Sequence, residues 1–144
     1  MRRHLPIFLL LALGGLFPLA RAEEIVVIVH PGSPLRELTR EQLSDLYLGR
    51  LRAIGSSERL LVLDQPRDSA LRARFFRHLN GMELRRVNAY WARLQFSGDA
   101  TPPVPLPDSR SVVDQVRRNP LAIGYVEAEA VTDQVRTVLN LGRR

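Results

Sequence analysis

The sequence predicts an α/β protein, built as an open, mostly parallel sheet with helices on both faces. Two observations carry this prediction. Short, apolar runs at residues 25–29 and 60–64 have the composition of strands that are covered on both faces. Segments with helical spacing of apolar residues alternate with such runs along the chain of 144 residues. Because cysteine is absent, packing alone must hold the fold together.

The first 22 residues predict export. A basic start, Met1 to His4, precedes an apolar run from Leu5 to Leu19. The triplet Ala20-Arg21-Ala22 then matches the small-residue cleavage site of a secretory signal peptide. The run is short for a membrane span, so an uncleaved anchor is the less favoured alternative. We expect residues 1–22 to be a signal peptide cleaved after Ala22, residues 23–144 to form one domain, and the protein to be periplasmic.

Charge and composition exclude several functions. All 21 basic residues counted as Lys or Arg are arginines, and three of them lie within residues 1–22, which leaves 18 against 15 acidic residues. This modest excess, without interleaved aromatic and basic residues, does not predict nucleic-acid binding. Beyond residue 22 the chain has only His30 and His78, with no cysteine and no paired ligand spacing. We therefore expect no metal site and no cofactor.

The first half of the domain is predicted to contain two strands with a helix between them. Residues 25–29 form the first strand. Thr39 then caps a helix, Gln42 completes the capping box three residues later, and Gly49 ends the helix. Residues 60–64 form the second strand. Its separation from the first suits a β-α-β crossover, in which the two strands are parallel.

Two further helices follow, and then a stretch that predicts a loop. The first of these helices begins at Asp68 or Ser69 and ends at Asn80-Gly81. The next carries Trp91 on its apolar face, and Tyr90, Trp91 and Phe96 are expected in the core. Residues 97–108 contain Gly98 and four prolines, which predicts a stiff loop that cannot pair as a central strand.

The last part of the domain is predicted to contain one helix and two strands. Asp108 or Ser109 caps the helix, and Asn119-Pro120 ends it. The strands are expected at residues 122–126 and 135–141.

Two helix starts are the candidate ligand site. In open α/β sheets, ligands collect where strands end at their carboxyl edge and helices begin. The first backbone N–H groups of a helix lack partners within it, the helix dipole adds positive charge there, and an arginine beside a hydroxyl suits an oxyanion. Asp and Ser also cap helices, and that alternative stays open. The candidate residues are Arg67, Asp68, Ser69 and Ala70 at one start, and Ser109, Arg110 and Ser111 at the other.

No catalytic residue is predicted. Ser69 has no histidine to activate it, and the chain contains no G-x-S-x-G elbow. Asp64 and Asp68 are conceivable as an acid and a base, but aspartates that flank a turn more often bind local backbone. We therefore expect a protein that is not an enzyme.

Four segments resemble the phosphate-binding periplasmic proteins of ABC transporters. Residues 38–50 are similar to the family signature L-x-x-x-x-L-x-x-I-F-x-G-K, and residues 122–127 to the later strand G-A-I-G-Y-V-E. Between them, residues 63–76 fall where the family places its anion-binding turn, and residues 90–98 resemble its short, single-lobe relatives. The resemblance covers nearly all of the domain and implies one lobe of the periplasmic-binding-protein type 2 fold.

The resemblance also implies a ligand, although the anion-binding turn differs. Phosphate-binding relatives carry a turn of the type R-S-D-G-S-G-T, whereas residues 64–70 read D-Q-P-R-D-S-A. Arg67, Asp68 and Ser69 are the chemical counterparts, the Ser-Gly-Thr core is absent, and Pro66 removes one donor. Full members close two lobes around the ligand, and this chain matches one.

Two hypotheses about function follow. The first is a periplasmic solute-binding-like domain that presents a helix start to a small oxyanion such as phosphate. The second is an interaction module that has kept the fold and docks on a membrane-bound transporter or sensor kinase.

Overall fold

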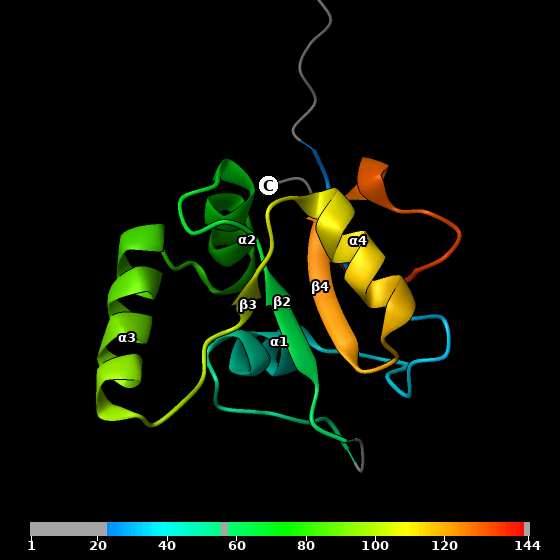
Figure 1. The fold of residues 1–144 in the computed structure, drawn as a ribbon. Coiled ribbons are helices and arrows are strands. Elements are labelled where there is room, and N and C mark those ends of the chain that lie inside the picture. Colours follow the sequence, from blue (N-terminus) through cyan, green and yellow to red (C-terminus); the bar gives the residue numbers. More distant parts are fainter. Residues whose placement is uncertain (1–22, 56–57, 143–144) are drawn as a thin grey trace, which may run out of the picture.

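The computed structural model describes residues 23–55 and 58–142, so the predicted signal peptide lies outside the described residues. No helix within these two ranges is both long and apolar enough to cross a membrane. The predicted helices and strands beyond residue 22 are all present. Figure 1 labels the four α-helices and the strands β2, β3 and β4. In chain order the elements are β1 (Ile25–Val29), α1 (Arg40–Tyr47), β2 (Leu61–Asp64), α2 (Ala70–Asn80), α3 (Leu84–Ser97), β3 (Val104–Pro105), α4 (Ser109–Arg118), β4 (Ala122–Glu127), the 3-10 turn η1 (Ala128–Ala130) and β5 (Arg136–Gly142).

The described strands form one sheet in the order β3-β2-β4-β1-β5. β2 is parallel to both β3 and β4, while β1 is antiparallel to its two neighbours, β4 and β5. It follows that β2, β3, β4 and β5 share one direction and that β1 opposes them. The prediction of an open, mostly parallel sheet is confirmed.

The predicted β-α-β crossover between the first two strands is wrong. β4 lies between β1 and β2, and β1 runs antiparallel to β4, with Val27 opposite Tyr125. An entirely apolar strand indicates burial on both faces, which a strand of either direction satisfies at the centre of a sheet. The spacing between the two runs permits a crossover but does not require one.

Helices cover both faces of the sheet, as predicted (Figure 1). Ile25, Val27 and Val29 of β1 point to the side that α1, α2 and α3 cover. The alternate residues, Val26 and Ile28, point to the other side, where α4 packs. Successive strand residues face opposite sides of a sheet, so one five-residue strand supplies both cores.

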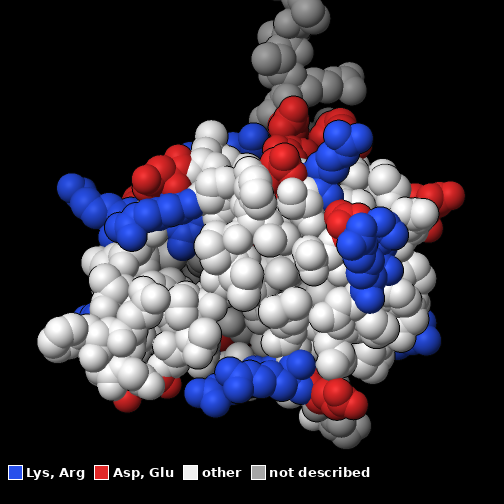
Figure 2. All heavy atoms as spheres, in the orientation of Figure 1, with Lys and Arg blue, Asp and Glu red and all other residues white. Residues whose placement is uncertain are grey.

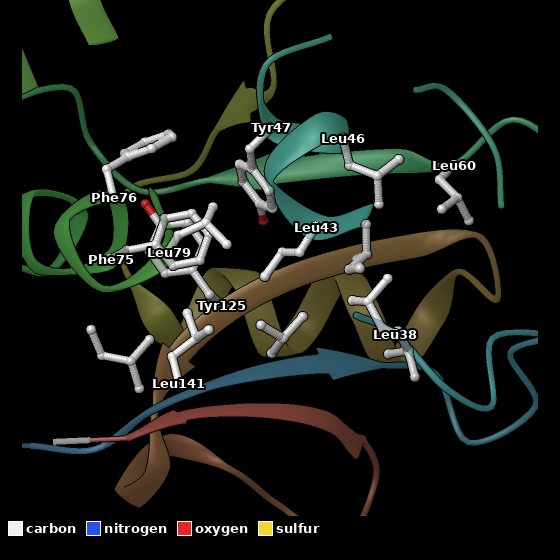
Figure 3. Close-up of a cluster of buried hydrophobic side chains, with 14 of the residues drawn as sticks. Leu38, Leu43, Leu46, Tyr47, Leu60, Phe75, Phe76, Leu79, Tyr125 and Leu141 are labelled. Atoms are coloured by element: carbon white, nitrogen blue, oxygen red, sulfur yellow. The ribbon is translucent and has the colours of Figure 1, made fainter. Parts of the chain in front are cut away.

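Four aromatic rings form the centre of the larger core (Figure 3). Phe75 of α2 stacks on Tyr125 of β4 with a ring separation of 3.5 Å and an interplanar angle of 1°. Tyr47 of α1 meets Phe75, Phe76 and Tyr125 edge-on. Its hydroxyl donates to the carbonyl of Leu63 at 2.6 Å, which ties α1 to β2. Burial, with a smaller contribution from the charge of Asp64, raises the pKa of Tyr47 well above its ordinary value, so this hydroxyl keeps its proton.

Close packing on the other face depends on Gly124 of β4. A Cβ placed there would lie 2.5 Å from Cγ1 of Val112, so α4 approaches β4 more closely than any larger residue allows. The absence of a side chain at this position therefore lets α4 pack directly against β4.

Two details of the region from 84 to 108 differ from expectation. Trp91 is buried, but Phe96 is 96% exposed, so its prediction as a core residue is wrong. Phe96 follows Trp91 by five residues, which places it about 140° around the helix axis from the buried side. The Pro-rich stretch contains a two-residue strand, β3, but it lies at the edge of the sheet, where proline is tolerated.

Candidate functional site

Both predicted helix starts lie at one edge of the sheet, where β2, β3 and β4 end. α2 follows β2 directly, and α4 follows β3, which is parallel to β2 and pairs Pro105 with Asp64. Asp64 and Glu127 are the last residues of β2 and β4. We call this region the carboxyl edge. Figure 2, in the orientation of Figure 1, shows acidic and basic side chains close together along the upper rim of the molecule.

Three of the predicted polar residues act in helix capping. Ser69 is the N-cap of α2, and its hydroxyl oxygen accepts from the N–H of Arg72 at 3.1 Å. Asp108 is the N-cap of α4 and accepts from both the N–H and the hydroxyl of Ser111 at 2.8 Å. The N–H of Ser111 is the main reason why the pKa of Asp108 is lowered.

A buried ion pair lies beneath the start of α2. Nε of Arg72 donates to Oδ2 of Asp64 at 2.9 Å, and the two residues are only 6% and 5% exposed. The other carboxylate oxygen of Asp64 accepts from the Tyr125 hydroxyl at 2.5 Å and from the Gln65 N–H at 2.8 Å. Burial, followed by the charge of Asp64, raises the pKa of Tyr125 well above its ordinary value. Tyr125 therefore remains a protonated donor to this carboxylate.

Arg72 also connects the strand end to α3. Its Nη1 donates to the carbonyl of Arg67 at 2.9 Å and to Oδ1 of Asn88 at 2.7 Å, and its guanidinium lies 5.1 Å from the centre of the Phe76 ring. These contacts occupy most of the guanidinium and hold the turn before α2 in place.

Gln65 links the two helix starts. Its amide nitrogen donates to the hydroxyl of Ser109 and to the carbonyl of Tyr125, both at 3.1 Å. The Ser109 hydroxyl in turn donates to Oε2 of Glu127 at 2.5 Å. At the start of α4, the Ser109 hydroxyl is therefore already hydrogen-bonded to a carboxylate of the protein itself.

Four of the predicted residues line two separate hollows. Arg67 and Asp68 are exposed, lie 4.0 Å apart and line a hollow between the start of α2 and α3, together with Arg85 and Asn88. Arg110 and Ser111 line another hollow beside α4. The hydrogen bond between Gln65 and Ser109 connects the starts of α2 and α4. The exposed Arg67 and Arg110, however, line different hollows. Among the described residues, no group of three or more His, Cys, Asp or Glu side chains could hold a metal ion.

Sequence reasoning missed the importance of Arg72, Gln65 and Glu127. A signal for Arg72 was present, because it lies between Leu71 and Phe75 on the side of α2 that packs inward. An arginine at such a position needs an acidic partner, and Asp64, which ends an apolar strand eight residues earlier, is the nearest candidate. No comparable pattern pairs Ser109 with Glu127, since the strand and helix that carry them meet only in the fold.

Comparison with known proteins supports the fold. No family model matches the chain, and no curated protein matches its sequence. Solved structures do match. An ABC-type phosphate transport receptor from Vibrio cholerae is 18% identical, with a TM-score of 0.63, and the match covers 81% of this chain and 45% of the receptor. A putative phosphate ABC transporter substrate-binding protein from Clostridium perfringens, solved with bound phosphate, is 22% identical, with a TM-score of 0.64 and coverages of 81% and 44%.

A third neighbour is PstS from Borrelia burgdorferi, which is 13% identical, with a TM-score of 0.60 and coverages of 81% and 46%. Because all three neighbours are less than 25% identical to this chain, the comparison establishes the fold that they share with it. This chain has the α/β fold of those proteins and spans less than half of their length.

Proposed function

We propose that this chain is an exported, non-enzymatic binding-protein-like domain that holds a small oxyanion, with phosphate as the first candidate, at the start of α2. The observation that carries the proposal is the hydroxyl of Ser69. Its oxygen accepts from the helix, but its hydrogen has no partner among the described residues. A hydrogen-bond donor that lies at a helix start and has no acceptor within the protein can bind an anion.

Several other groups at the same place support this assignment. The N–H groups of Ala70 and Leu71 belong to the first turn of α2 and have no acceptor within the helix. The guanidinium of Arg67 is exposed two residues before Ser69 and supplies positive charge. Among the neighbouring structures, the Clostridium perfringens protein contains bound phosphate.

The start of α4 is the weaker candidate. The hydroxyl hydrogen of Ser109 is donated to Glu127, so a bound anion would have to displace a carboxylate. Asp108 adds a second negative charge at the same helix start. For these reasons we assign the ligand to Arg67, Ser69 and Ala70 and not to Ser109, Arg110 and Ser111.

Calorimetric titration with phosphate and sulfate tests this function. We expect saturable binding that Arg67→Ala and Ser69→Ala each weaken by about tenfold, because each removes one donor to a charged group. The matched control is Arg110→Ala, which removes the same charge at the other helix start and should leave the affinity unchanged. Absence of heat with both anions would rule out the proposal, as would equal weakening by Arg110→Ala.

A second candidate function is docking on a membrane-bound transporter or sensor kinase. The observation that favours it is the internal network of Asp64, Arg72, Gln65, Ser109 and Glu127, which uses most polar groups of the carboxyl edge without a ligand. If docking is the function, the protein should copurify with membranes, and the yield should not change in the Arg67→Ala, Ser69→Ala double variant. Recovery of a freely soluble monomer alone would contradict this second candidate.

A further inference from the structure

A second concentration of positive charge lies between the end of α1 and the side of α3. Arg50 reaches a hollow of about 380 Å³ from the chain just after α1, and Arg86 and Arg93 reach it from α3. Leu48, Met82 and Tyr90 form much of the remaining wall. The Tyr90 hydroxyl donates to the carbonyl of Leu48 at 2.5 Å. This hydrogen bond joins α3 to the end of α1, the two segments that line the hollow.

The spacing along α3 explains why its two arginines meet in this hollow. Arg86 and Arg93 are seven residues, or about two turns, apart and therefore lie on one side of the helix. The helix from Leu84 to Ser97 contains three arginines and no acidic residue. The guanidinium of Arg93 lies 6.0 Å from the centre of the Tyr90 ring, which orients it toward the same side.

The positive charges in this hollow are largely uncompensated. None of its described lining residues is acidic. Arg50 has a partner in Asp45 at 3.5 Å, but this is an exposed pair of the kind that contributes little stability. Neither Arg86 nor Arg93 forms an ion pair with a described residue. Three like charges around one hollow repel each other unless a counter-ion is bound.

We propose that Arg50, Arg86 and Arg93 form a binding site for a phosphate group, separate from the start of α2. Planar guanidinium forks match the oxygens of phosphate and can each donate two hydrogen bonds to them. The phosphate group has two possible sources, a small soluble phosphate or the headgroup of an anionic lipid. Phe96, three residues after Arg93 and 96% exposed, is the apolar side chain that a lipid surface would contact.

The site is tested in a protein that already carries Arg67→Ala and Ser69→Ala, so that the start of α2 makes no contribution and the two proposals fail independently. Titration with inorganic pyrophosphate should show saturable binding. The Arg86→Ala, Arg93→Ala double variant should weaken this binding by at least about tenfold, and the Arg86→Lys, Arg93→Lys double variant should weaken it less. The matched control is Arg117→Ala with Arg118→Ala on α4, which removes two charges that already pair with Asp114.

Sedimentation with vesicles of phosphatidylcholine and phosphatidylglycerol separates the two sources. A lipid source predicts vesicle binding that is lost in the Arg86→Ala, Arg93→Ala variant and in Phe96→Ser, while Phe96→Ser keeps its affinity for pyrophosphate. A soluble source predicts pyrophosphate binding with no arginine-dependent vesicle binding. Failure of both ligands to bind, or an equal loss in the α4 control, would overturn the proposal.

Discussion

Replacing Arg72 with alanine is expected to lower the free energy of unfolding by about 3–5 kcal/mol. The substitution leaves the carboxylate of Asp64 buried without its cationic partner, because Asp64 is only 5% exposed. It also removes the donors to the Arg67 carbonyl and to Asn88. A domain of this size is stable by about 5–15 kcal/mol in total, so the loss is a large part of its stability.

Urea unfolding followed by circular dichroism measures this effect. The matched control is Arg77→Ala on the same helix, whose partner Glu83 lies 3.6 Å away at the surface. Exposed pairs contribute about 0–1 kcal/mol, so the control should unfold almost as the unmodified protein does. A difference of less than about 1 kcal/mol between the two variants would show that the Asp64–Arg72 pair does not hold this edge together.

Replacing Phe75 with alanine is expected to cost about 3–5 kcal/mol. Phe75 is fully buried and contacts Tyr47, Phe76 and Tyr125, so its removal leaves a cavity at the centre of the larger core. The consequence extends to the carboxyl edge, since the ring of Tyr125 stacks on Phe75 while its hydroxyl donates to Asp64. We expect a lower affinity for phosphate in addition to lower stability.

Thermal unfolding with a matched Phe96→Ala variant tests the packing argument. Both variants lose the same atoms, but Phe96 is 96% exposed, so its replacement should change the free energy of unfolding by no more than about 0.5 kcal/mol. Equal losses in the two variants would contradict the assignment of Phe75 to the core.

Local patterns in the sequence predicted the elements of this fold well. Thr39 and Gln42 form the predicted capping box at the start of α1, and Gly81 ends α2 in the left-handed conformation. Such local patterns did not predict that β1 runs antiparallel to its neighbours. Its apolar residues report burial on both faces, whereas its place beside β4 is decided by long-range pairing.

The candidate site was predictable only in part. The position of both helix starts at one edge follows from the order of strands and helices, and the structure confirms it. The difference between the two starts depends on Glu127, which reaches Ser109 across 18 residues of sequence. Sequence alone therefore treats Ser69 and Ser109 alike, although only one of them has a hydroxyl hydrogen to offer.

The most direct test of the proposed function is to follow backbone amide resonances by NMR while phosphate is added. The amides of Ala70 and Leu71 have no acceptor within α2, and we predict that both shift saturably as phosphate binds. The amide of Gly81, which donates to the Arg77 carbonyl at the other end of α2, should stay fixed. If phosphate saturates the protein while the Ala70 and Leu71 resonances do not move, the oxyanion is not held at the start of α2.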